Sequence, residues 1–292
     1  IGAVLLIVSL FLDWYETLTG WTVFEIVDLV LVGLALWAID FADRFFLLKL
    51  KDAAEVGLYS VGVRITTAIL LLLIALRTAW PAFAYSIKED AEAKRTYAFV
   101  LTYVLFAACW FSVTLSLLAP WLVRLLTAPA YYAGSRVVPL LAFGATAFIG
   151  FNVMSIGIGR AKRTQFNWVV TGAAAVVAIG LNFALIPPYG MIGAAISTLV
   201  AYTVMFVGMT VRAQQVFPVP YQWRRLGTVV AAAVALTVLG KWLHVPLEGA
   251  VALSAVYPLV LLPLGFYLPV ELRRIRALVS PALVAPLAAI VG

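Results

Sequence analysis

Ionisable side chains are scarce in this sequence. Asp, Glu, Lys and Arg make up 11% of its 292 residues, whereas hydrophobic residues make up 65%, and the mean hydropathy is +1.08. A soluble domain is roughly a quarter charged and about half apolar. Long apolar runs recur along the whole chain, and no polar stretch is long enough to fold alone. The composition therefore excludes a soluble globular protein and predicts an all-α, polytopic transmembrane helical bundle.

Cysteine and histidine are almost absent. Cys109 is the one cysteine and lies inside an apolar run, and His244 is the one histidine. They cannot form a disulfide framework, a zinc site or a Cys–His pair, so we expect no metal and no cofactor. An enzyme acting on lipid-linked sugars needs a placed acid, base or set of metal ligands. The loops on one side offer only Asp52, Glu55, Glu248 and His244, far apart in sequence, and we expect a protein that is not an enzyme.

The apolar runs predict about eight to nine membrane spans. The first of them is short. The second carries several charged residues near its ends, and the last contains two prolines. The expected spans are residues 1–12, 22–46, 56–83, 97–122, 137–159, 166–186, 190–211, 227–243 and 249–268.

The net charge of +7 comes from Lys and Arg residues that lie mostly between these runs. In a membrane protein such an excess indicates topology and contact with anionic lipid headgroups rather than nucleic acid. If the loop at 88–95 is cytoplasmic, the loops at 160–163 and 212–225 and the tail at 273–276 are cytoplasmic too. That side then carries roughly twice as many basic residues as the other, as the positive-inside rule expects.

Two arginines, Arg64 and Arg77, flank a run of twelve apolar or neutral residues in one expected span. A charge at the bilayer centre costs at least ~2.5–3.5 kcal/mol. The two are about 20 Å apart along a helix with ~1.5 Å rise per residue, so they cannot occupy the same interface. We expect Arg64 to face a cavity. For Arg77 the alternatives are a side chain that snorkels to the headgroups and a second position in that cavity.

Asp40, Asp43 and Arg44 form the next group of ionisable residues. The spacing of Asp40 and Arg44 allows an i, i+4 ion pair, which lowers the cost of both charges near a membrane. The group is either an interfacial ion pair at the end of a span or part of a cation or proton relay. Asn152 and Asn182 are also expected within spans, where they either form hydrogen bonds between helices or contact a sugar.

A succession of motifs resembles a known family. The sequence "DRFFL" ends one span and "VGLYSVGVRI" follows. The next span closes on "AWPAF". A glycine-rich span ends in "GIGRAKRT", and "LNFALIPPYGMIGAAISTLVAY" comes after it. Over residues 40–268 this order is similar to the C-terminal half of Wzx-type oligosaccharide flippases. These belong to one superfamily with the lipid II flippase and the MATE (multidrug) exporters.

The resemblance implies one lobe of a MATE-like exporter, the complete transporters having about fourteen spans in two lobes. It divides the chain into membrane segments unlike the flippase at 1–39, a flippase-like lobe at 40–270, and a basic stretch with an apolar tail at 271–292. It also implies that arginines in the helix of Arg64 and Arg77 line the central cavity. The expected location is the bacterial inner membrane, with the basic loops and the C-terminus in the cytoplasm.

The implied function is flipping of undecaprenyl-diphosphate-linked oligosaccharide, in which guanidinium groups bind the diphosphate. The expected partners are that lipid, membrane lipids, and a second transmembrane lobe or a second copy of the chain. One alternative is an inactive half-transporter that needs a partner lobe. Another is a MATE-like exporter of small cations, which predicts acidic cavity residues. The expected spans from 97 to 243 contain none.

Overall fold

A computed structural model describes residues 13–15, 18–19, 34, 39, 41–161 and 167–268 of the chain. Two short strands, β1 (Asp13–Tyr15) and β2 (Leu18–Thr19), pair in antiparallel orientation. Residues 41–50 are helical. The helices after them are α4 (Ala53–Thr66), η1 (Thr67–Ile69), α5 (Leu70–Ser86), α6 (Asp90–Leu126), η2 (Pro129–Arg136), α7 (Val138–Arg160), α8 (Asn167–Tyr189), α9 (Met191–Val216), α10 (Trp223–Trp242) and α11 (Leu247–Val260).

The prediction of a helical membrane bundle is confirmed. Within the described ranges, six helical stretches are long and apolar enough to cross a bilayer, the first being α4, η1 and α5 taken together. The apolar helix α11 is shorter. The expected count of eight to nine spans is not confirmed, because the expected span 1–12, most of 22–46 and the tail 271–292 lie outside the described residues.

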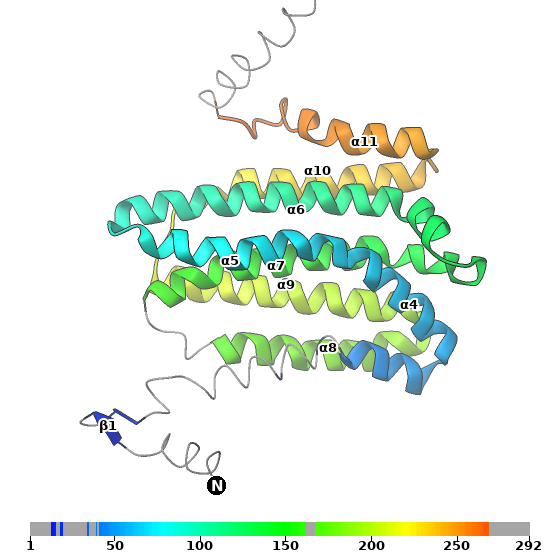
Figure 1. The fold of residues 1–292 in the computed structure, drawn as a ribbon, viewed down its shortest axis with the longest axis horizontal. Coiled ribbons are helices and arrows are strands. Elements are labelled where there is room, and N and C mark those ends of the chain that lie inside the picture. Colours follow the sequence, from blue (N-terminus) through cyan, green and yellow to red (C-terminus); the bar gives the residue numbers. More distant parts are fainter. Residues whose placement is uncertain are drawn as a thin grey trace, which may run out of the picture.

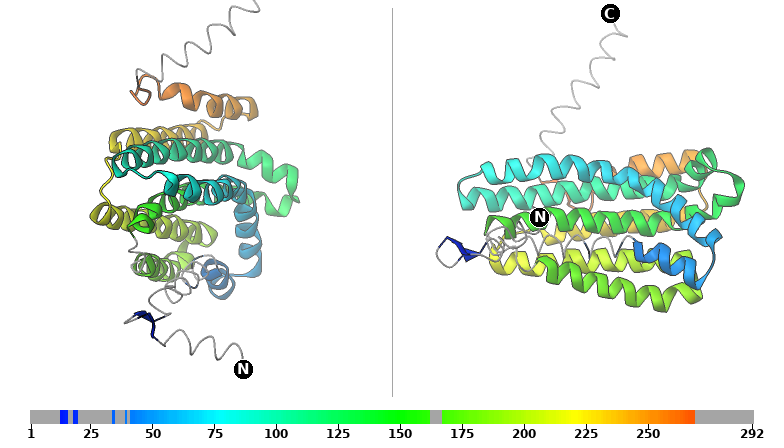
Figure 2. Two further views of the ribbon diagram at one scale, coloured as in Figure 1. Left: turned by 60° about the vertical axis from the view of Figure 1, so that its left-hand side comes forward. Right: turned by 60° about the horizontal axis from the view of Figure 1, so that its bottom comes forward.

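The long helices lie side by side (Figure 1). From one side of the bundle to the other, α8 packs on α9, α9 on α7, α7 on α6, and α6 on α10 and α11. The two further views keep these neighbours (Figure 2). Small residues permit this spacing, since helices in a membrane approach closely only where side chains are small. Gly193, Ser197 and Ala201 recur every four residues along α9, and all three are buried.

The expected span 56–83 is one helical stretch with a break at its centre. The 3-10 turn η1 separates α4 from α5, and α4 is visibly bent away from α5 in Figure 1. The hydroxyls of Thr66 and Thr67 each donate a 2.9 Å hydrogen bond to the carbonyl four residues earlier. Such back-bonding hydroxyls bend helices, and short 3-10 segments within helices mark departures from the regular α geometry.

Both ends of this broken helix are tied to other helices. At the start of α4, the Asp52 carboxylate accepts the backbone N–H of Glu55 at 2.8 Å. The Glu55 carboxylate in turn accepts the N–H of Met191 at 2.8 Å and so caps the first turn of α9. Carboxylates suit these places because the first N–H groups of a helix have no partner within it.

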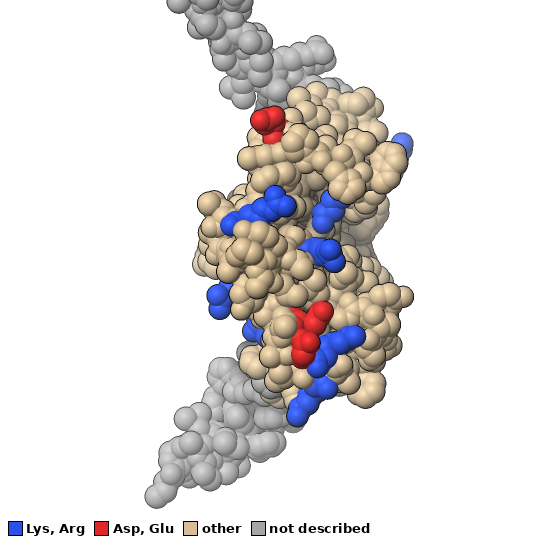
Figure 3. All heavy atoms as spheres, turned by 90° about the vertical axis from the view of Figure 1, so that its right-hand side faces the viewer, with Lys and Arg blue, Asp and Glu red and all other residues tan. Residues whose placement is uncertain are grey.

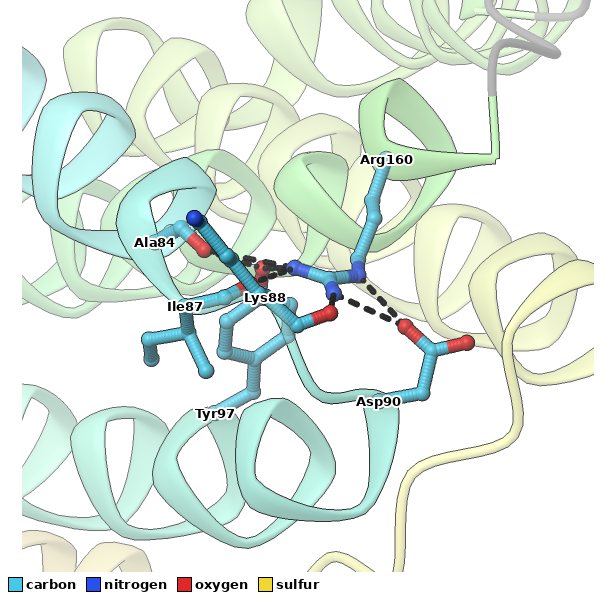
Figure 4. A network of polar contacts seen from close by, with 6 residues as sticks. All are labelled: Ala84, Ile87, Lys88, Asp90, Tyr97 and Arg160. Atoms are coloured by element: carbon cyan, nitrogen blue, oxygen red, sulfur yellow. Dashed lines mark hydrogen bonds and ion pairs between the residues drawn. The ribbon is translucent and has the colours of Figure 1, made fainter.

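At the other end, Arg160 from the last turn of α7 closes the end of α5 (Figure 4). Its guanidinium donates to the carbonyl oxygens of Ile87 and Lys88 at 2.8 and 3.1 Å. It also forms an ion pair with Asp90 at 2.8 Å. The final carbonyls of a helix lack intrahelical partners, so one side chain of α7 satisfies the turn that joins α5 to α6.

Arg160→Ala is expected to destabilise the bundle by about 2–4 kcal/mol, because the carbonyl oxygens lose a charged donor. Asp90→Ala is the matched control. The Asp90 side chain is 68% exposed, whereas that of Arg160 is 15% exposed, and exposed ion pairs contribute only ~0–1 kcal/mol. Thermal unfolding of the two purified variants in detergent tests this difference. Equal melting temperatures would show that the carbonyl contacts add little.

Candidate functional site

A cavity of about 640 Å³ lies beside the break in the α4–α5 stretch. Cavities that take small molecules fall in the range of ~300–1,000 Å³. This one is partly open and its walls are mostly apolar, with charged side chains at three positions. Its lining residues are Phe41, Asp43, Arg44, Tyr59, Val63, Thr66, Thr67, Leu73, Ile74, Arg77, Leu141, Ala145, Phe148, Thr198 and Tyr202.

Arg77 is anchored in the cavity wall by α7. Its Nε donates a 2.9 Å hydrogen bond to Oδ1 of Asn152, and its guanidinium carbon lies 5.5 Å from the centre of the Phe148 ring. Asn152 is oriented by its own Nδ2, which donates to the Phe148 carbonyl at 2.7 Å. No described residue accepts a hydrogen bond from the two Nη nitrogens of Arg77. The contacts thus fix one edge of the guanidinium and leave the other for a ligand.

Asp43 is the buried acid of the site, and only 2% of this residue is exposed. Nδ2 of Asn182 donates to its Oδ1 at 2.7 Å, and the hydroxyls of Tyr59 and Thr198 both donate to its Oδ2. Donors on α4, α8 and α9 therefore converge on one carboxylate. Burying a charge is costly unless it is hydrogen-bonded, and these three donors offset that cost.

An acceptor next to this carboxylate remains unsatisfied. Oδ1 of Asn182 is buried and has no hydrogen-bond partner among the described residues. Asn182 itself is fully buried, and buried polar atoms are nearly always paired. The unpaired oxygen of Asn182 is thus an acceptor near the Asp43 carboxylate that a proton donor or a small cation would satisfy. Within the described residues, no three His, Cys, Asp or Glu side chains gather as a metal cluster.

The structure places the predicted cations differently from our expectation. Arg64 is exposed on α4 and does not line the cavity. Val63 does line it, and the next residue of an α-helix points about 100° away. Arg77 and Arg44 line the cavity instead. The expected pair of Arg44 with Asp40 cannot be compared, because Asp40 lies outside the described residues.

The structure brings the predicted residues together in two groups. Asn152 joins Arg77, and Asn182 joins Asp43, so both asparagines contact the ionisable residues of the cavity. Sequence reasoning missed Tyr59, Thr198 and Phe148. Their only sequence signal is the polar or aromatic character of single residues in apolar runs, which most often reflects packing.

Charged side chains are found mainly at the ends of the helices. Figure 3 views the end at which α4 begins, where Lys and Arg side chains lie scattered over a largely uncharged surface and the Asp and Glu side chains lie in small, separate spots. Basic residues at helix ends can reach lipid headgroups. Arg44, Arg77 and Asp43 differ from these residues because they line a cavity.

Comparison with known proteins gives little further information. No protein-family model matches the chain. A segment of 90 residues is 31% identical to an uncharacterized membrane protein of Methanocaldococcus jannaschii, which corresponds to 30% of this chain and 17% of the relative. The chain therefore spans only a small part of the curated relative it matches, whose printed name states no activity. The similarity agrees with the membrane-spanning fold.

Proposed function

We propose that this chain is a lobe of a transporter that flips undecaprenyl-diphosphate-linked oligosaccharide across the bacterial inner membrane. The observation that carries the proposal is Arg77, a permanent cation anchored by Asn152 and Phe148 in the wall of a half-open cavity inside a membrane bundle. Ionisable residues within spans mark substrate and ion pathways. The resemblance of residues 40–268 to Wzx-type flippases supports the same substrate.

The chemistry of the substrate fits the cavity. A diphosphate must lose water as it enters a membrane, and a guanidinium offsets that loss with parallel N–H donors that match phosphate oxygens. A guanidinium also stays charged under cellular conditions, so the attraction does not depend on a change of protonation. A cavity of 640 Å³ has room for the diphosphate and its first sugar. The remaining glycan and the polyprenyl chain would lie outside it.

The carboxylate of Asp43 would couple the uptake of a proton or a small cation to the transport cycle. Asp43 belongs to residues 41–50, and its donors come from three further helices, α4, α8 and α9. Uptake of a proton or a small cation by this carboxylate would therefore alter contacts among four helices at once. Alternating access needs such a link between ion binding and helix packing.

Two alternatives remain from the sequence. A MATE-like exporter of organic cations would use acidic cavity residues, but the described cavity has one carboxylate, which already accepts three hydrogen bonds, and two arginines. An incomplete lobe that needs a partner lobe or a second copy is compatible with a cavity that is only partly enclosed. The first alternative is the weaker because its substrate and the two arginines have the same charge.

The test is lipid flipping by the purified chain in proteoliposomes. Fluorescent polyprenyl-diphosphate-linked oligosaccharide is placed in both leaflets, and a membrane-impermeant quencher reports how fast the inner pool reaches the outside. We expect Arg77→Ala to abolish the protein-dependent rate and Arg64→Ala to retain it, since Arg64 lies outside the cavity. A wild-type rate equal to that of protein-free vesicles would favour the incomplete lobe. Equal rates for wild type and Arg77→Ala would refute the site.

A further inference from the structure

The two halves of the α4–α5 stretch are packed to different degrees. Only three residues of α4 are exposed, and two of them lie in its first turn. Of the described residues of α5, only Leu73, Trp80 and Ala84 are buried. The first half is therefore embedded in the bundle, whereas the second half lies at its edge.

Backbone contacts hold α4 in place. A Cβ at Gly62 would lie 2.3 Å from Cγ2 of Val137, and a Cβ at Gly134 would lie 2.5 Å from the carbonyl oxygen of Leu58. Helices in membranes approach so closely only through small residues. The carboxylate of Glu55 also caps the first turn of α9. Movement of α4 would therefore separate it from η2 and α9 together.

Side chains of α7 hold α5. The Nε of Arg77 donates to Asn152 in the middle of the helix. Beyond its end, the guanidinium of Arg160 donates to the carbonyl oxygens of Ile87 and Lys88 (Figure 4). Contacts of single side chains break and re-form as rotamers change. The attachment of α5 can thus be released without separation of the packed helices α6, α7 and α9.

The turn η1 lies between the fixed half and the releasable half. Thr66 and Thr67 on either side of its start direct their hydroxyls to the carbonyls four residues earlier. Short 3-10 stretches within helices often mark hinges, where a few residues absorb the change in backbone angles. Residues of both halves line the cavity, Val63 from α4 and Ile74 from α5. A rotation at η1 would therefore move one wall of the cavity and leave the other.

We propose that α5 is a movable wall of the cavity, which pivots at η1 and is held closed by the contacts of Arg160 with the carbonyls of Ile87 and Lys88. Release of these contacts lets α5 swing outward, which widens the cavity and carries Arg77 away from Asn152. The inference concerns the motion of the protein alone and does not depend on the proposed substrate.

Distances between pairs of spin labels on the full chain in lipid nanodiscs test the inference. The labels are attached to introduced cysteines after Cys109, which is a free thiol, is replaced by Ala. One pair joins Ala79 of α5 to Val207 of α9, and the control pair joins Ala54 of α4 to the same Val207. All three positions are exposed. Ala79 precedes Pro81, so a bend at that proline alone would not move the label.

Arg160→Ala is expected to raise the ratio of long to short distances for the Ala79 pair at least about tenfold, because α5 loses its charged donor. The Ala54 pair should keep the distances that it has without this change. Asp90→Ala is the matched control, since it removes the ion pair and leaves the carbonyl contacts of Arg160. It should leave both pairs unchanged.

Arg160→Lys keeps the charge but lacks the forked donors, and it replaces Arg160→Ala if the latter does not give a monodisperse protein. It should change the Ala79 pair in the same direction and by less. If the distances of that pair do not change, Arg160 does not hold α5 and the inference is wrong. If both pairs broaden alike, the whole bundle has loosened and the pivot at η1 is wrong.

Discussion

Replacing Asp43 by Ala is expected to destabilise the bundle by about 2–4 kcal/mol, which lowers the melting temperature by roughly 5–15 °C. The variant leaves the donors of Tyr59, Asn182 and Thr198 without their acceptor in a buried place. Each orphaned donor costs about 1–3 kcal/mol, and removal of a buried charge returns part of the sum. Thermal unfolding of the detergent-solubilised variant measures the effect.

Asp43→Asn separates this structural role from the proposed relay. The oxygen of the new amide would accept from Tyr59 and Thr198, and its nitrogen would donate to Oδ1 of Asn182, which has no described partner in the wild type. This requires only that the Asn182 amide rotate by half a turn. We therefore expect a melting temperature close to that of wild type.

Transport by Asp43→Asn should lose its response to an imposed proton or sodium gradient, because the amide is not protonated near neutral pH and lacks the negative charge that attracts a sodium ion. The flux of labelled lipid-linked oligosaccharide with and without each gradient measures this. A variant that unfolds like wild type and still responds to a gradient would show that Asp43 has only a structural role. A large loss of stability would show instead that the charge itself holds the three donors.

The helices could be predicted from the sequence because the signal is local. A run of about twenty apolar residues defines a span whatever lies around it, and the expected spans from 56 to 243 each correspond to a described helix. Helix ends were less predictable. The helix α6 begins at Asp90 and ends at Leu126, beyond the expected 97–122, because the mostly polar residues 90–96 continue the helix before the apolar run and residues 123–126 add one more turn after it.

The site depends on the rotation of each helix, which sequence spacing specifies poorly. The expectation that Arg64 faces a cavity assumed one regular helix from 56 to 83, and the 3-10 turn η1 changes the relation between its two halves. Composition and hydropathy cannot locate that turn, because threonines are tolerated within helices. The pairing of Asp43 with Asn182 spans 139 residues of sequence and follows only from how α8 and α9 pack.

The turn between α8 and α9 was recognisable from its sequence, "IPPYG". Two prolines lie in the last turn of α8, and Gly190 follows with a φ of 55°. Glycine populates this left-handed region without the strain that a Cβ brings. The close contact of Gly193 with the backbone of α8 could be predicted only in part. A small residue at this position predicts that another helix lies close by, but it does not say which helix.

Gly193→Ala is expected to destabilise the fold more than alanine at any other described glycine. A Cβ at this position would lie 2.2 Å from the carbonyl oxygen of Leu185 and 2.5 Å from its carbonyl carbon. Backbone atoms within a helix cannot move aside as a side-chain end can. To accept the methyl group, α8 and α9 would have to separate next to Asn182 and Thr198, which both donate to Asp43. We expect a loss of at least about 3 kcal/mol.

Gly172→Ala and Gly180→Ala are the matched controls, because both glycines lie in α8 and a Cβ at either would meet no atom within 4 Å. Alanine at an unobstructed helix position stabilises by about 0.5–1 kcal/mol relative to glycine. The melting temperatures should therefore move in opposite directions, downward for the variant at 193 and slightly upward for the controls. If Gly193→Ala unfolds like the controls, α8 and α9 do not pack as closely as the structure has them, and the Asp43 centre built between these helices would lose its support.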